Sequence, residues 1–582
     1  MRLFLLLTLV PSVALAEHPL TERYLDGLFK AKPHLASFMG DHRFDGKIVD
    51  LSPSALQSRD RELVALQADL AKSKATNTDD EVDAAILSDA IGLELLYLRE
   101  IRDWEWDPRL YDSFPTYDPR EIVAARLADM IHGDYAPETE RRVAVAQQLA
   151  ALPAFLLQER AALEGAKRHP AKVYVDAAIN DNAGRIEFFE GDLKAFTVSN
   201  AKAEAVRIAA VKALREYQTY LEKTLSTRAD GDFRLGDALY RKKFRLALQT
   251  DQTPDQLVPR ALASLKAARE EMGAVAKKLH AQLWPKDPVP SDMAVLINKV
   301  KDELAKDHAK PAELVQAHAA NLDALRAFIE KNDLLSLPPR DSLLVEAMPA
   351  FKRGSSAAEY LAPGALTHAE KWHATYYVDP IDPKWPADKV ESYLRGQNNY
   401  ELQLIASHEA YPGHHTQFFY ARRSLNRLRA VMWNAPFAEG WAVYGEGLMV
   451  TRGWGGPLND RFRFYDLRGQ MIVAANTVLD VNLHTGKWSD KEAVDFMTNE
   501  TFQEQAMADK KLLRAKLDTT QLVQYYLGLD EIRVLEKDFL AKNKVAAFDR
   551  AGQRAFDEAL IGHGTLAIKY LRRFVLPAKA AQ

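Results

Sequence analysis

The sequence HEAYPGHHTQ spans residues 408–417, and the sequence EGWAVYGE spans residues 439–446. The first stretch places three histidines and one glutamate within eight residues. The second places Glu439 and Glu446 seven residues apart, which puts them on about one face of a helix. Two histidines and a glutamate around zinc, with a second glutamate as general base, form a hydrolytic metal site. We therefore expect the rest of the chain to hold these two stretches face to face.

The spacing of the histidines departs from the familiar helical zinc motif H-E-x-x-H, in which the two histidines are four residues apart. Here Pro412 and Gly413 stand where the second histidine would be. On a regular helix His415 lies about 20° from the direction of His408, whereas His414 lies about 120° away. Proline disrupts a helix, however, and a Pro-Gly bulge would bring His414 back to the ligand position. The residues alone thus leave two alternatives: a bulge with His414 or a straight helix with His415.

The surroundings of the two glutamates favour a functional site over a solvated surface. Trp441, Val443 and Tyr444 lie between Glu439 and Glu446 and create an apolar setting. An unpaired carboxylate is costly there. One carboxylate can therefore bind the metal, while the other orients a histidine through its second ring nitrogen. A lone helical histidine is usually structural, but three of the 15 histidines are crowded together here, which favours a metal site.

The composition limits the possible classes of protein. The chain has 582 residues, of which 47% are hydrophobic and 27% charged, as in a globular protein with a large core. The net charge of −4 makes nucleic acid a poor candidate for a partner. The sequence contains no cysteine, so any metal site must use histidine, aspartate and glutamate.

The first residues have the pattern of an export signal. A positive start at Arg2 precedes an apolar run from Leu3 to Leu9, and Ala14-Leu15-Ala16 is a small-x-small cleavage site. We expect residues 1–16 to be a signal peptide cut after Ala16. The apolar run is too short to cross a bilayer, which needs about 20 residues. The expected location is the bacterial periplasm, without stable insertion into the membrane.

The remaining chain is predicted to be mainly α-helical. Apolar residues recur at helical spacing in most segments, and Thr253-Pro254-Asp255 is a typical helix start. Short β-branched or aromatic runs at Val345–Met348 and Thr375–Val378 predict a small β element near residues 345–380. We expect a helical N-terminal region over 17–336 and a metal-binding region over 337–582, in one continuous architecture.

The two motifs resemble those of the bacterial domain-of-unknown-function 885 family. The similarity extends over most of the chain after residue 16. Weaker similarities lie in Phe233–Tyr240, Tyr360–Pro363, Tyr377–Pro380 and Phe556–Leu560 with Gly564. The resemblance implies a zincin-like metallopeptidase of the Glu-zincin type, with a large multi-helical fold around a deep cleft.

The resemblance also assigns roles to individual residues. It implies that zinc is bound by His408, His414 and Glu439, and that Glu409 is the general base. That family pattern keeps the histidine directly after Pro-Gly, which selects His414 over His415.

Two further residues are carried over from the resemblance to stabilise the oxyanion. His484 lies in the run Asp480–His484, and Tyr525 follows Gln521. This sequence departs from the family at Asn482, where the family has glycine, and at Thr519-Thr520, where it has Pro-Gly. These departures affect the surroundings of His484 and Tyr525 and leave the metal ligands unchanged.

The sequence therefore predicts an exported zinc peptidase in which Glu446 supports a histidine ligand. We expect the Thr375–Val378 strand to pair with an extended peptide substrate, as edge strands do. One alternative is a zinc hydrolase acting on other amides or on peptidoglycan fragments. A second is a non-catalytic helical binding protein with a structural metal. A catalytic site keeps an open position, whereas a structural site is closed by four protein ligands.

Overall fold

The computed structural model describes residues 17–112, 114, 120–348, 357–367, 373–423 and 426–576. The predicted signal peptide, residues 1–16, lies outside this range. Within it, most residues are helical, which confirms the predicted mainly α fold with a small β element. None of the helices in these ranges is both long enough and apolar enough to cross a membrane.

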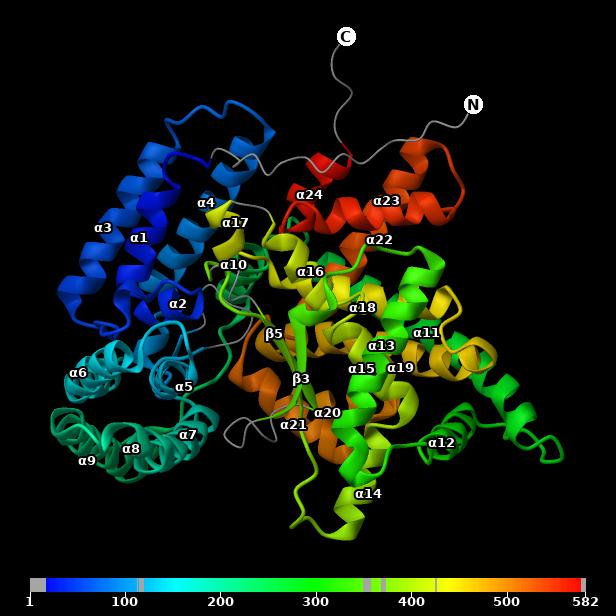
Figure 1. Cartoon of the computed structure of the whole chain (residues 1–582), viewed down its shortest axis with the longest axis horizontal. Coiled ribbons are helices and arrows are strands. Elements are labelled where there is room, and N and C mark those ends of the chain that lie inside the picture. Colours follow the sequence, from blue (N-terminus) through cyan, green and yellow to red (C-terminus); the bar gives the residue numbers. More distant parts are fainter. Residues whose placement is uncertain are drawn as a thin grey trace.

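The N-terminal half consists of helices in two groups, seen on the left of Figure 1. The first group contains α1 (Thr21–Ala31), α2 (Pro33–Phe38), α3 (Pro53–Leu70) and α4 (Thr78–Leu96). The second contains α5 (Ala124–His132), α6 (Glu138–Gly165), α7 (Lys172–Glu190), α8 (Asp192–Thr197) and α9 (Ala201–Lys223). A two-stranded ribbon of β1 (Tyr111–Asp112) and β2 (Arg120–Glu121) lies between the two groups in sequence. The second group has a hydrophobic core of its own, built from residues 110–225.

Four helices connect this half to the rest of the chain: α10 (Asp237–Ala247), α11 (Pro254–Leu283), α12 (Met293–Leu304) and α13 (Leu314–Asn332). The start of α11 is the one predicted from the sequence. Pro254 occupies the first position, and the backbone N–H of Thr253 donates to Gln256 Oε1 at 2.9 Å. This capping box satisfies backbone groups that the first turn would leave unpaired.

The C-terminal half begins with a three-stranded sheet and continues in helices. The strands are β3 (Leu343–Ala347), β4 (Ala358–Leu361) and β5 (Ala374–Val378). The helices before the second metal motif are α14 (Ala387–Gly396), α15 (Asn399–Glu409), α16 (His414–Ala421) and α17 (Arg427–Val431). Those from it onward are α18 (Ala435–Thr451), α19 (Asn459–His484), α20 (Asp490–Thr501), α21 (Gln505–Leu517), α22 (Gln524–Asn543), α23 (Arg550–Ile561) and α24 (Ile568–Val575).

The strand order corrects one prediction. The sheet has the order β3-β5-β4, with β5 parallel to β3 and antiparallel to β4. The predicted strand at Thr375–Val378 is therefore the central one, and both of its edges are already paired. An extended peptide can add only at an edge strand, so β5 cannot receive it. The sequence pattern identified the strand but could not show its neighbours, because β4 was not recognised.

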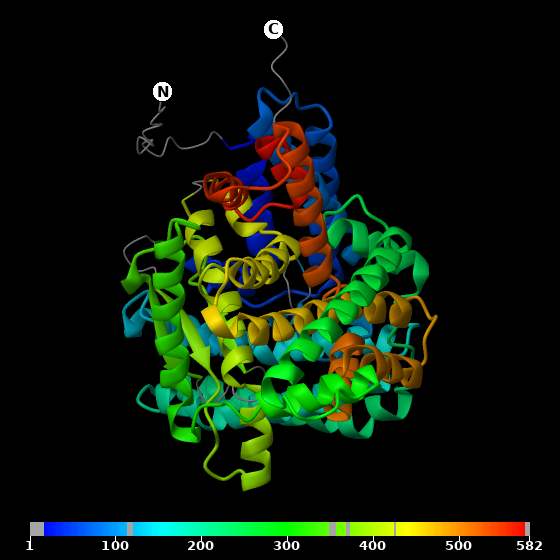
Figure 2. The same ribbon diagram turned by 90° about the vertical axis from the view of Figure 1, so that its right-hand side faces the viewer.

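The largest hydrophobic core joins both halves. It includes Tyr24 and Leu87 from the first helices and Trp441, Leu479 and Leu571 from the last ones. Figures 1 and 2 show α18 and α19 inside the molecule, with α11 packed along α19. The helices that carry the two sequence motifs are thus held by the central packing of the protein.

Candidate metal centre

The segment between the first histidine and the next two is a tight turn between two helices. Helix α15 ends at Glu409, and α16 begins at His414. The turn folds back so closely that a Cβ added at Gly413 would lie 1.8 Å from the carbonyl oxygen of His408. Only glycine fits there. The structure thus contains neither a straight helix nor a bulge within one helix, because Pro412 ends α15 altogether.

The turn points the side chains of the two consecutive histidines toward different neighbours. His414 directs Nε2 toward Glu439, with Nε2 3.6 Å from Oε1. His415 instead places its Nε2 3.0 Å from the hydroxyl oxygen of Ser342, in the core of the protein. His414 is therefore the histidine that faces His408 and Glu439, and His415 packs behind it.

Helix α18 brings Glu439 to the histidines and is fixed on two sides. The indole N–H of Trp441 donates to the carbonyl oxygen of Pro412 at 2.9 Å, which ties α18 to the turn. On its other side, Gly440 meets Gly528 of α22 so closely that a Cβ at Gly528 would lie 1.7 Å from the carbonyl oxygen of Pro436. Such backbone contact requires small residues and leaves little freedom for the position of Glu439.

The side chains of His408, His414 and Glu439 converge on one point. Their ligand atoms all lie within 4.8 Å of one another, and His408 Nε2 is 3.3 Å from Glu439 Oε2. Donors that are each about 2.1 Å from one tetrahedral zinc ion lie about 3.4 Å apart. Glu439 Oε2 is buried and accepts no hydrogen bond, which is costly unless a cation balances it. The donor set and its spacing therefore fit zinc.

The electrostatics of the three residues also suit a cation. Burial lowers the pKa of His414 to about 4, so its imidazole is neutral at pH 7 and can donate a lone pair. Burial alone would raise the pKa of Glu439, but His414 and His408 reverse this and lower it, so the carboxylate is ionised. Burial alone would lower the pKa of His408, but its contacts with Glu439 and Glu446 raise that pKa well above the ordinary value. A metal ion would therefore have to displace a proton from His408 on binding.

Glu446 supports His408 from behind. Its Oε1 lies 2.7 Å from Nδ1 of His408, on the ring edge opposite to Nε2. A carboxylate on Nδ1 keeps the proton there and leaves Nε2 as the metal-binding nitrogen. This is the role that the sequence left open for one of the two glutamates of α18.

Glu409 lies beside the cluster but does not belong to it. Its Oε2 accepts a hydrogen bond from the backbone N–H of Tyr360 in β4 at 3.0 Å. Burial raises the pKa of Glu409 to about 7, and the neighbouring His408 partly opposes this rise. A carboxylate with a pKa near neutrality is suited to accept and return a proton.

His484 is not at the cluster. It is the last residue of α19, fully buried, with Nε2 2.7 Å from the carbonyl oxygen of Ala515. The part of α19 that lies beside Glu446 is at Gly469, and fifteen helical residues span about 22 Å. Burial lowers the pKa of His484 to about 3, so it is a neutral core residue. We therefore leave His484 out of the candidate site. The sequence could not show which part of α19 lies beside the metal ligands.

Tyr525 is connected to the cluster through Arg514. The guanidinium of Arg514 donates to the Tyr525 hydroxyl at 3.3 Å, and Arg514 is also one of the charges that lower the pKa of Glu439. Tyr525 lies at the start of α22, three residues before the contact of Gly528 with α18. Arg514 was missed in the sequence, because a single arginine in an amphipathic helix carries no specific signal.

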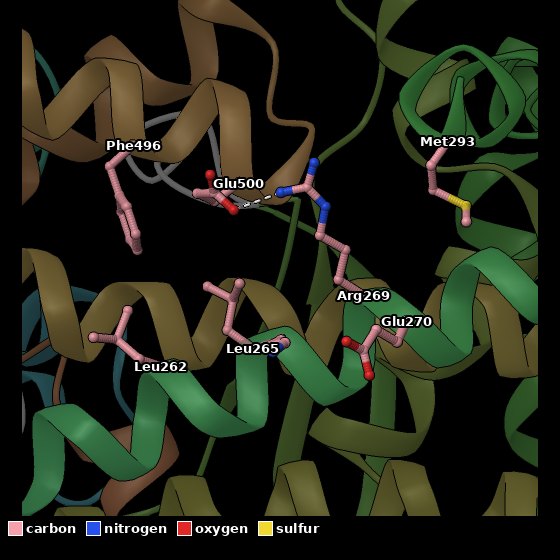
Figure 3. Close-up of a pocket in the computed structure, with 8 residues that line it drawn as sticks. Leu262, Leu265, Arg269, Glu270, Met293, Phe496 and Glu500 are labelled. Carbon is pink, nitrogen blue, oxygen red and sulfur yellow. Dashed lines mark hydrogen bonds and ion pairs between the residues drawn. The ribbon is translucent and has the colours of Figure 1, made fainter. Parts of the chain in front are cut away.

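A separate groove lies between α11 and α20 (Figure 3). It has a volume of about 470 Å³ and is lined largely by apolar groups such as Leu262, Leu265 and Phe496. Arg269 and Glu500 form an ion pair across it. None of its lining residues belongs to the metal cluster, so we do not assign the chemistry to this groove.

Solved structures from two bacteria have the same fold. A candidate lipoprotein of unknown function from Shewanella oneidensis is 26% identical, with a TM-score of 0.82, and the match covers 97% of this chain and all of the other. A candidate lipoprotein from Colwellia psychrerythraea is 16% identical, with a TM-score of 0.75 over 97% of this chain and 99% of the other. The second likeness shows the fold alone.

The family assignment comes from the sequence as a whole. No curated protein matches this chain. Residues 33–575 match the family described as bacterial protein of unknown function, DUF885. This range includes both candidate metal motifs. The match covers almost the whole described chain. This protein therefore belongs to the DUF885 family.

Proposed function

We propose that this protein is a zinc-dependent peptidase of the zincin type. The observation that carries the proposal is the convergence of His408, His414 and Glu439 within 4.8 Å, with Glu409 beside them. A zinc ion held there would act as a Lewis acid, polarising a peptide carbonyl and lowering the pKa of water. Within the described residues this group has three members, which leaves a fourth position for substrate or water.

The chain's own residues have distinct tasks in this proposal. Glu409 accepts a proton from the attacking water and passes it to the leaving amine. Glu446 holds His408 in one tautomer through the 2.7 Å contact to Nδ1. Tyr525, whose hydroxyl oxygen accepts from Arg514, donates a hydrogen bond to the carbonyl oxygen as negative charge develops there.

Strand β4 takes the place that the sequence gave to β5 in binding the peptide. It is an edge strand of the sheet, and its Tyr360 N–H contacts Glu409. An extended peptide that pairs with β4 would lie along the general base. This arrangement supports a peptide substrate over a small non-peptide amide, because it provides main-chain hydrogen bonds to an extended chain.

Export to the periplasm is the second part of the proposal. It is supported by the signal pattern of residues 1–16 and by similarity to candidate lipoproteins. The sequence contains no cysteine, which is the residue that carries the lipid of a bacterial lipoprotein.

Removal of the metal tests the proposed activity. We expect a mixture of short peptides to be cleaved by the purified protein, to resist cleavage after dialysis against a chelator, and to be cleaved again when zinc is returned. Mass spectrometry of the products measures each step. Cleavage that continues undiminished in the dialysed protein would contradict a zinc peptidase. Cleavage of peptidoglycan fragments but of no peptide would favour the alternative hydrolase.

A further inference from the structure

Three cationic side chains gather next to the candidate metal centre. They are Lys511 and Arg514 of α21 and Arg468 of α19, which we call the cationic cluster. Lys511 Nζ donates to Asn476 Oδ1 at 2.9 Å. Burial and the positive charges of Arg514 and Arg468 together lower the pKa of Lys511 to about 7. Lys511 and Arg514 are three residues apart and therefore share one face of α21.

Two contacts connect the cationic cluster to the helices around the metal centre. Arg514 donates to the hydroxyl oxygen of Tyr525 at 3.3 Å, and Tyr525 lies three residues before Gly528, which meets α18. Arg468 lies 3.4 Å from Glu401 Oε1, and Glu401 is seven residues before His408 on α15. A substrate bound at the metal would therefore extend past these cations.

Lys511 has no anionic partner among the described residues. No carboxylate of the described residues lies within ion-pair distance of Lys511, whose only hydrogen-bond acceptor among them is the amide oxygen of Asn476. An ammonium group has three donors, so two remain for a ligand. Arg468 also has a buried Nε that makes no hydrogen bond, and Glu401 balances its charge only in part. Arg514 is exposed, so the cationic cluster can be reached from solvent.

We propose that the cationic cluster, with Lys511 at its centre, binds the free C-terminal carboxylate of a peptide whose scissile bond lies at the metal centre. This inference rests on the proposed function and narrows its substrate to peptides cleaved near their C-terminus. A carboxylate suits the cluster because it accepts charge-assisted hydrogen bonds from ammonium and guanidinium groups together.

Helix α19 runs past both sites. A Cβ at Gly469 would lie 3.9 Å from Glu446 Oε2, the carboxylate behind His408, and Asn476, which accepts from Lys511, is seven residues further along the same helix. Seven helical residues span about 10 Å. One short peptide can therefore reach both sites, and we expect the released fragments to come from the C-terminal end.

Binding to an inactive variant tests the carboxylate site directly. Zinc-loaded Glu409→Gln protein would be titrated calorimetrically with N-acetyl-trialanine, with its C-terminal amide, and with a matching amide that ends in glutamate. We expect the free acid to bind at least about tenfold more tightly than the plain amide. Adding Lys511→Met should remove this preference, whereas Lys277→Met, at an exposed lysine of α11, should keep it.

The outcomes distinguish a C-terminal carboxylate site from a site for an acidic side chain and from a failure of the proposed peptidase activity. Equal binding of acid and plain amide, absence of binding by the acid, or an unchanged preference in Lys511→Met would overturn the carboxylate site. Equal binding of the acid and the glutamate amide would show that the cationic cluster reads a side chain instead of the C-terminus. The acid–amide comparison needs no change at residue 511, so it decides even if Lys511→Met fails to fold. If the protein still prefers the free acid over the plain amide but the wild type cleaves no peptide, only the proposed peptidase activity is contradicted.

Discussion

Replacing Glu409 by glutamine is expected to reduce peptide hydrolysis by about a hundredfold to ten-thousandfold, because general acid–base catalysis contributes about that much. Glutamine keeps the size of the side chain but cannot accept the proton. Glu409 is absent from the convergent group of His408, His414 and Glu439, so zinc content should not change. The measurement combines initial rates with metal analysis of the same protein sample.

A matched control separates this effect from a general loss of charge. Glu391 is an exposed glutamate of α14, and Glu391→Gln should leave both rate and zinc content unchanged. Full activity in Glu409→Gln would remove Glu409 from the proposed chemistry. Loss of zinc together with activity would instead make Glu409 a ligand, which its contact with Tyr360 does not suggest.

Replacing Glu439 by glutamine is expected to weaken zinc binding by more than a hundredfold. It removes the one negative charge among the three convergent groups and leaves a weaker amide oxygen in its place. Glu446→Gln should weaken binding by about 10- to 100-fold, since residues that orient a ligand have smaller effects than the ligand itself. Competition with a chromophoric chelator measures both affinities.

The relative sizes of the effects in Glu439→Gln and Glu446→Gln distinguish the ligand from the residue that supports it. Zinc should raise the melting temperature of the wild-type protein, because a ligand that binds only the folded state stabilises it. This rise should be smaller in Glu446→Gln and absent in Glu439→Gln. The reverse order would assign the ligand role to Glu446 and the supporting role to Glu439.

The helical character of the fold could be predicted from the sequence, since local patterns specify it. The start of α11 at Thr253 and Pro254 depends only on capping groups within one turn, and the structure confirms it. The sheet was predicted in part, because β4 has no distinctive composition and its pairing with β5 depends on residues far apart in sequence. The position of β5 at the centre of the sheet could therefore not be derived.

The candidate site shows the same limit. The residues left His414 and His415 as alternatives, because the path of the backbone at Gly413 depends on its contact with the carbonyl of His408. The position of His484, about 22 Å along α19, required the packing of that helix against α18. The cationic cluster around Lys511 consists of residues from two helices, so the sequence of either helix alone could not reveal it.

We expect His408, His414 and Glu439 to hold one zinc ion. Diffraction data collected on both sides of the zinc absorption edge, from crystals of the purified protein grown with zinc, would locate it. We predict a single strong anomalous peak between His408 Nε2, His414 Nε2 and the Glu439 carboxylate, each at about 2.0–2.2 Å. A fully ordered site without such a peak, or a peak that lies on His415 or His484 instead, would contradict it.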